Sequence, residues 1–97
     1  MFDIRITKPG ELMISGRFDA ISVDRAREVL DQVTASSTVD LKHLDYMSSA
    51  GIGILLAAQK RLLEKGHKLT LINVSSHMRD LFLMTRLDTV FEIVDVG

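Results

Sequence analysis

Two adjacent serines, Ser48 and Ser49, stand where a modified hydroxyl could have a large effect. They follow a short apolar segment and a polar loop, and they precede a run whose apolar spacing predicts a helix. The first turn of a helix carries unpaired backbone N–H groups and the positive end of the helix dipole. A phosphate on such a serine would be stabilised there, and it would add about −1.5 to −2 charges. The pattern therefore favours a site switched by phosphorylation.

Helix capping by one serine is the simplest alternative explanation of the pair. An N-cap serine contributes about 1 kcal/mol to helix stability. Gly51 and Gly53, however, fall in the first turn of the predicted helix, where each costs about 0.5–1 kcal/mol relative to alanine. Selection for helix stability alone does not explain these glycines. Small residues at this position leave room for another protein to approach closely.

Catalytic motifs do not fit the residues around the serine pair. The nucleophile elbow of hydrolases has glycine two residues before and two residues after the serine, and Met47 occupies the first of these positions before Ser49. A dinucleotide fingerprint would need glycine where Leu56 stands, and no glycine is followed by Lys-Ser or Lys-Thr. The three histidines are far apart in the chain. We therefore expect no enzymatic activity, no cofactor and no metal site.

Composition points to an ordinary globular domain. The 97 residues are 46% apolar and 26% charged, which predicts one domain over residues 1–97. The net charge is −1 and the basic residues are scattered, so we expect no nucleic-acid partner. The absence of cysteine excludes disulfides and thiol catalysis. No apolar run reaches the roughly 18–20 residues of a membrane span, so we expect a cytoplasmic protein without direct membrane insertion.

Strands and helices are predicted to alternate along most of the chain. After an opening hairpin each further strand is reached through a helix, which favours an α/β fold with parallel strand pairs. Residues 16–19 break the second strand, and residues 42–48 are expected to be a loop. The predicted order is β-β-α-β-α-β-α-β, with strands at 2–7, 12–15, 38–41, 69–74 and 90–94, and helices over 23–33, over 50–65 and after a cap at Ser75 or Ser76.

The helical periodicity also predicts which side chains are buried. In the second helix, Leu63 falls on the apolar face and Arg61 on the solvent face. In the third helix, Leu83 falls off the inward stripe, so we expect it to be an exposed apolar contact. Three methionines are interpreted as flexible core residues, namely Met47, Met78 and Met84.

Three segments, spread over nearly the whole length of the chain, carry a further signal. They are Asp40-Leu41 followed by Tyr46, Met47 and residues 48–53 (Ser-Ser-Ala-Gly-Ile-Gly); Gly16-Arg17-Phe18-Asp19; and Leu81-Phe82 with Met84 and Leu87. Together they resemble the STAS domain family, and within it the single-domain anti-sigma factor antagonists, also called anti-anti-sigma factors. The resemblance implies a STAS-type mixed β-sheet with helices.

The resemblance also implies a function, which is partner switching rather than catalysis. The unphosphorylated protein would bind an anti-sigma factor that is itself a serine kinase of the histidine-kinase ATPase type. Phosphorylation of the serine would break the complex, and a metal-dependent phosphatase of the PP2C type would restore it. The output would be regulation of transcription through release of the sigma factor.

The family motif places the phosphoacceptor on Ser49 and Asp19 beside it. Ser48 stands where the family has aspartate, Ala50 where it has serine or threonine, and Arg86 where it often has glycine. Ser48 is therefore a rival acceptor. The missing aspartate also leaves open an alternative function, a non-switching STAS subunit bound to the ATPase of a lipid transporter. A second alternative, an enzyme of unknown type, would require turnover that is lost in Ser49→Ala without any partner present.

Residue patterns and resemblance together predict a partner-binding surface at the start of the second helix. Small residues would let the partner approach closely, and flanking polar and apolar side chains would contact it. The predicted surface residues are Asp19, Met47, Ser48, Ala50, Gly51, Ile52, Gly53 and Leu83.

Overall fold

Alternating apolar residues form a sheet in the computed structural model, which describes residues 1–94. Leu12, Ile14 and Phe18 of one strand are buried at alternate positions, as expected for a strand covered on one face. The elements are β1 (Asp3–Lys8), β2 (Glu11–Phe18), η1 (Ala20–Ser22), α1 (Val23–Leu30), β3 (Ser37–Asp40), β4 (Leu44–Met47), α2 (Ser49–Leu63), β5 (Leu69–Ile72), α3 (Ser76–Met84), η2 (Leu87–Thr89) and β6 (Glu92–Val94).

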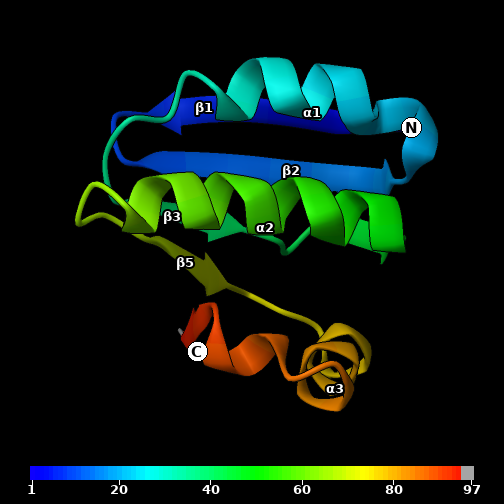
Figure 1. Ribbon diagram of the computed structural model, residues 1–97. Helices are drawn as coiled ribbons and strands as arrows, with labels where there is room; N and C mark the ends of the chain where they lie inside the picture. Colours follow the sequence, from blue (N-terminus) through cyan, green and yellow to red (C-terminus); the bar gives the residue numbers. More distant parts are fainter. Residues whose placement is uncertain (95–97) are drawn as a thin grey trace.

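The strands form one mixed sheet in the order β1-β2-β3-β5-β6, and β4 pairs with β2 off this path. β1 and β2 form an antiparallel hairpin, and the other pairs are parallel. Val39 lies opposite Leu12 on one side and opposite Leu71 on the other, so these buried residues share one face. In Figure 1, α1 and α2 lie side by side and begin at the end of the molecule where β2 ends. The predicted α/β fold class is confirmed.

The segment predicted to be a loop over residues 42–48 contains the short strand β4, and β2 continues past residue 16. Both differences depend on Gly16, which has a φ of +81°, a left-handed conformation that glycine adopts easily. Its N–H donates to the His43 carbonyl at 3.0 Å, and the β2–β4 register shifts directly after it. Glycine therefore makes a bulge instead of ending the strand. Phe18 then pairs with Met47, which joins the end of β2 to the serine segment.

The buried face of α2 is rotated relative to the prediction. Leu63, expected to face inward, is 50% exposed, whereas Gln59 is only 1% exposed. The glutamine is buried because both ends of its amide are hydrogen-bonded: Nε2 donates to the Val90 carbonyl at 2.8 Å, and Oε1 accepts from the Leu69 N–H at 2.7 Å. A polar side chain in this position connects α2 to β5 and to the segment before β6.

Arg61 is not a freely solvated residue of α2. Its guanidinium donates to the carbonyls of Leu30 at 2.8 Å and Val33 at 3.0 Å. These carbonyls lie at and just after the end of α1, where backbone acceptors lack partners within the helix. Arg61 therefore fixes α1 against α2.

The end of α3 differs from the prediction at one methionine. Ser75 caps the helix by accepting from the Met78 N–H at 3.2 Å, and Met78 is buried as expected. Met84 is 83% exposed, because it lies on the solvent side at the last position of the helix. Arg86, two residues after the helix, has a φ of +61°, the left-handed conformation that glycine most often supplies after a helix end.

Lys68 and Glu92 form an ion pair that links β6 to the residue before β5. The hydrogen bond and the charge of Lys68 lower the pKa of the Glu92 carboxyl. A lowered pKa means that this stabilisation is present above the ordinary glutamate pKa and is lost as pH falls through the lowered value. Because both side chains are at the surface, the pair has only a small role in holding β6.

Candidate functional site

Ser48 is the N-cap residue of α2. Its hydroxyl oxygen accepts from the Gly51 N–H at 3.4 Å, and its carbonyl accepts from the Ile52 N–H at 3.0 Å. Its own N–H donates to the Phe18 carbonyl at 2.9 Å, at the end of β2. These three hydrogen bonds fix Ser48 in place. Its hydroxyl is occupied as the acceptor for the Gly51 N–H, one of the first-turn N–H groups that lack a partner within the helix.

Ser49 is the first residue of α2 and is exposed. Its hydroxyl makes no hydrogen bond to any residue of the described chain, residues 1–94, so it is available for modification. The first turn contains no acidic residue. A phosphate here would therefore meet the helix dipole and the N–H groups of the first turn without a neighbouring carboxylate on that turn.

Two residues assigned to the partner-binding surface lie in the core instead. Met47 is only 5% exposed, and Gly51 is buried beneath the start of the helix. A Cβ on Gly51 would stand 2.8 Å from the Phe18 carbonyl oxygen, 2.9 Å from Phe18 Cγ and 3.0 Å from Met47 Cγ. Gly51 is therefore small because α2 packs closely on the end of β2, and the prediction that these two residues face a partner is wrong.

Gly53 differs from Gly51 in this respect. It is exposed, and a Cβ built on it meets nothing within 4 Å. Ser49, Gly53 and Ala57 are four residues apart, so they lie on one face of α2, and all three are exposed. Ala50 and Ile52 flank this face and are half-buried. The outward face beginning at Ser49 is therefore smooth and uncharged over its first two turns.

Asp19 follows Phe18 directly, so it lies at the same end of the sheet as the serines. Its carboxylate accepts from the Ile21 N–H at 3.2 Å and the Ser22 hydroxyl at 3.5 Å, and it lies 4.0 Å from Arg17 Nε. The carboxylate thus caps η1. The family resemblance implies a position for Asp19 beside Ser49, and the structure shows that its carboxylate holds this turn.

The sequence did not predict two exposed side chains at the end of the sheet that carries the serines. Ile21 of η1 is 93% exposed, and Tyr46 of β4 is partly exposed beneath the Arg17 guanidinium, which lies 4.4 Å from the ring centroid. No helical period marks a three-residue turn, and the Arg17–Tyr46 pair depends on the unpredicted strand β4. Leu83 of α3 is 54% exposed, as expected from its position off the apolar stripe.

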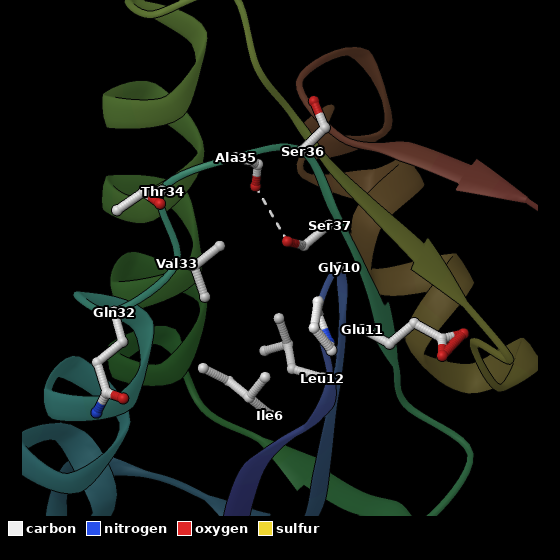
Figure 2. Close-up of a pocket in the computed structure, with 11 residues that line it drawn as sticks. Ile6, Gly10, Glu11, Leu12, Gln32, Val33, Thr34, Ala35, Ser36 and Ser37 are labelled. Carbon is white, nitrogen blue, oxygen red and sulfur yellow. Dashed lines mark hydrogen bonds between the residues drawn. The ribbon is translucent and has the colours of Figure 1, made fainter.

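One hollow lies at the opposite end of the sheet, between the β1–β2 turn and the segment after α1 (Figure 2). It has a volume of about 240 Å³, with Ile6, Leu12 and Val33 among its lining residues. The hydroxyl of Ser37 donates to the Ala35 carbonyl at 3.0 Å across its rim. Because its polar groups serve the loop itself and it is far from Ser49, we do not assign it to the candidate site.

Within residues 1–94 no group of three acidic or histidine side chains is arranged to hold a metal ion. None of the helices in that range is long and apolar enough to cross a bilayer. The site is therefore best described as an exposed hydroxyl at the start of a helix, surrounded by small and apolar residues.

Comparison with protein families identifies this arrangement. The model described as "Mlab, STAS domain" matches residues 5–95. The chain belongs to the STAS family. Among relatives, this STAS domain is 28% identical over 90 residues to an anti-sigma-B factor antagonist of Listeria monocytogenes, which covers 89% of this chain and 79% of the relative.

Solved structures share the fold of this STAS domain. An anti-sigma-factor antagonist domain protein from Planctomyces limnophilus superposes with a TM-score of 0.80 at 23% identity, covering all of this chain and 92% of the other. The Bacillus cell-fate determinant SpoIIAA in its phosphorylated form superposes with a TM-score of 0.74 at 20% identity, with the same coverage. At these identities the likeness shows the fold.

Proposed function

We propose that this STAS domain is an anti-sigma factor antagonist whose binding is switched off by phosphorylation of Ser49. Its partner would be an anti-sigma factor that is a serine kinase of the histidine-kinase ATPase type, and a PP2C-type phosphatase would reverse the modification. The names of the relatives support the antagonist function. The observation that carries the proposal is the difference between the two serines: the Ser48 hydroxyl caps α2, whereas Ser49 is exposed and its hydroxyl has no hydrogen-bond partner among residues 1–94.

The geometry gives a physical reason for switching. The unmodified face through Ser49, Gly53 and Ala57 is uncharged and can be buried against a partner at low cost. A phosphate at its edge would add bulk and a charge whose desolvation costs several kcal/mol unless it is paired. About 2.7 kcal/mol is enough for a hundredfold loss of affinity. In the free protein, the first turn of α2 would stabilise the phosphate.

Ser48 in place of the family's aspartate is compatible with this mechanism. Serine and aspartate are both good N-cap residues, and Ser48 caps α2 through its oxygen. The substitution therefore keeps the cap and removes a carboxylate next to the acceptor. Less repulsion would act on a phosphate at Ser49 than in a protein with aspartate at this position.

Phosphate mapping tests which serine is the acceptor. We expect the purified kinase, with ATP, to transfer one phosphate to the wild-type protein and to Ser48→Ala, and none to Ser49→Ala. The reason is that the Ser48 hydroxyl caps α2, whereas the Ser49 hydroxyl has no partner within residues 1–94. Intact mass and peptide mapping give the readout, and thermal unfolding checks that each variant is folded. Phosphate on Ser49→Ala would assign the acceptor to Ser48. Stable binding of all variants to a transporter ATPase, without phosphorylation, would support the non-switching alternative.

Gly53→Ala separates binding from stability. Alanine should stabilise α2 by about 0.5–1 kcal/mol, because a Cβ at this position meets nothing in the chain. We expect the same change to weaken kinase binding several-fold, since the methyl group would hold the partner's backbone away from the helix. Thermal unfolding and titration calorimetry measure the two effects. Unchanged affinity would place Gly53 outside the interface.

A further inference from the structure

Ile21 is a large apolar side chain with almost no cover from the rest of the chain. It is 93% exposed, whereas the adjacent Ser22 is buried. Single exposed apolar residues are common on protein surfaces and need no explanation by themselves. What distinguishes Ile21 is the way its backbone is held and its position in η1, which packs against α2.

The turn that carries Ile21 is held by hydrogen bonds from both sides. The Asp19 carboxylate accepts from the Ile21 N–H at 3.2 Å, and the Asp19 carbonyl accepts from the Ser22 N–H at 3.0 Å. The Ser22 hydroxyl also donates to the Arg17 carbonyl at 3.1 Å. Because these bonds fix the backbone before any partner binds, little conformational entropy is lost when the side chain is buried.

Ile21 also lies at the end of the molecule that carries Ser49. η1 packs against α2 and begins two residues after Phe18, whose carbonyl binds the Ser48 N–H and whose ring meets Gly51. Among the other exposed large apolar residues, Ile6 and Leu63 lie far from this end of the molecule. Ile6 lines the hollow at the opposite end, and Leu63 ends α2, about 20 Å along the helix from Ser49.

We infer that Ile21 is the apolar residue by which the face around Ser49 recognises its partner, and that Asp19 is the residue that positions it. The inference rests on the proposed function and names the same kinase as the occupant. The kinase would offer an apolar pocket for Ile21 beside the flat contact with Gly53. Asp19 then acts through its hydrogen bond from the Ile21 N–H, and the partner does not recognise its charge directly.

Titration of the purified kinase against single variants tests the role of Ile21. We expect Ile21→Ala to weaken binding at least tenfold without lowering the thermal midpoint, because the side chain has almost no contacts in the free protein. Leu63→Ala is the matched control, since it removes another exposed apolar side chain, and it should bind within twofold of the wild type. Ser49→Asp is measured in the same series.

Asp19 is tested by conservative replacement and by a double mutant. Asp19→Asn keeps an oxygen acceptor for the Ile21 N–H and should bind nearly as well as the wild type, whereas Asp19→Ala should lose affinity. In the Ile21→Ala background, Asp19→Ala should cause little further loss, since the side chain it positions is gone. Equal losses for Asp19→Asn and Asp19→Ala would show that the charge matters and overturn the positioning role.

The series distinguishes failure of this inference from failure of the proposed function. Loss of binding in Ser49→Asp together with wild-type affinity in Ile21→Ala would overturn the recognition role and leave the switch intact. If the kinase does not bind the wild-type protein, both the proposed function and the inference fail. Equal losses in Ile21→Ala and Leu63→Ala would show a general effect of removing apolar surface, and would also overturn the specific role.

Discussion

Replacing Ser49 with aspartate is expected to weaken binding to the kinase at least tenfold while leaving the fold intact. The carboxylate places a charge on the face that docks, and part of that charge must be desolvated in the complex. In the free protein the same carboxylate meets the positive end of the α2 dipole, which is favourable by about 0.3–1 kcal/mol. Titration calorimetry and thermal unfolding should therefore show weaker binding with equal or higher stability.

Ser49→Asn is the matched control for this prediction, because it has nearly the size of aspartate without its charge. It should bind within about threefold of the wild type. If asparagine and aspartate weaken binding equally, bulk rather than charge is responsible. If neither change alters the affinity, Ser49 does not lie in the interface, and the proposed switch is wrong.

Gly51→Val is expected to destabilise the protein by about 3 kcal/mol or more. The first added carbon would already stand 2.8 Å from the Phe18 carbonyl oxygen and 2.9 Å from Phe18 Cγ, and a branched side chain adds two further methyl groups. Phe18 is fully buried and Met47 nearly so, so neither can move aside easily. Chemical denaturation followed by circular dichroism measures the loss.

Gly53→Val provides the comparison on the same helix. Valine at this exposed position has open space and should leave stability within about 0.5 kcal/mol of the wild type, since β-branched residues and glycine are both modest helix formers. If both valine variants were equally stable, the close packing of α2 on β2 would be contradicted.

Periodicity was enough to predict most of the fold. The alternation in β1 and β2 and the apolar runs of β3 and β5 identified the sheet. The predicted cap at Ser75 is confirmed, and α2 begins at Ser49, one residue before the predicted start. β4 was missed because a four-residue strand next to a glycine bulge has the composition of a loop. Gln59 was missed because its burial depends on two backbone partners in distant segments, which no local pattern reveals.

At the candidate site, the sequence predicted the start of a helix near the serine pair, whereas the burial of individual residues differs from the prediction at Met47 and Gly51. The family motif led directly to Ser49, whose exposure supports the assignment. Gly51 and Gly53 are equivalent in sequence, and only the position of Phe18 shows that one serves packing and the other leaves a free surface. Ile21 could not be predicted, because the isolated residue carries no periodic signal and its exposure is set by the cap at Asp19.

The most direct test of the switch is the affinity of the kinase for the wild-type protein before and after stoichiometric phosphorylation, with Ser49→Ala treated in parallel. We expect phosphorylation to lower the affinity of the wild-type protein for the kinase at least a hundredfold, which corresponds to about 2.7 kcal/mol, and phosphatase treatment to restore it fully. Ser49→Ala should bind equally well before and after incubation with ATP. If protein that carries phosphate on Ser49 binds the kinase as tightly as unmodified protein, phosphorylation of Ser49 does not switch binding off.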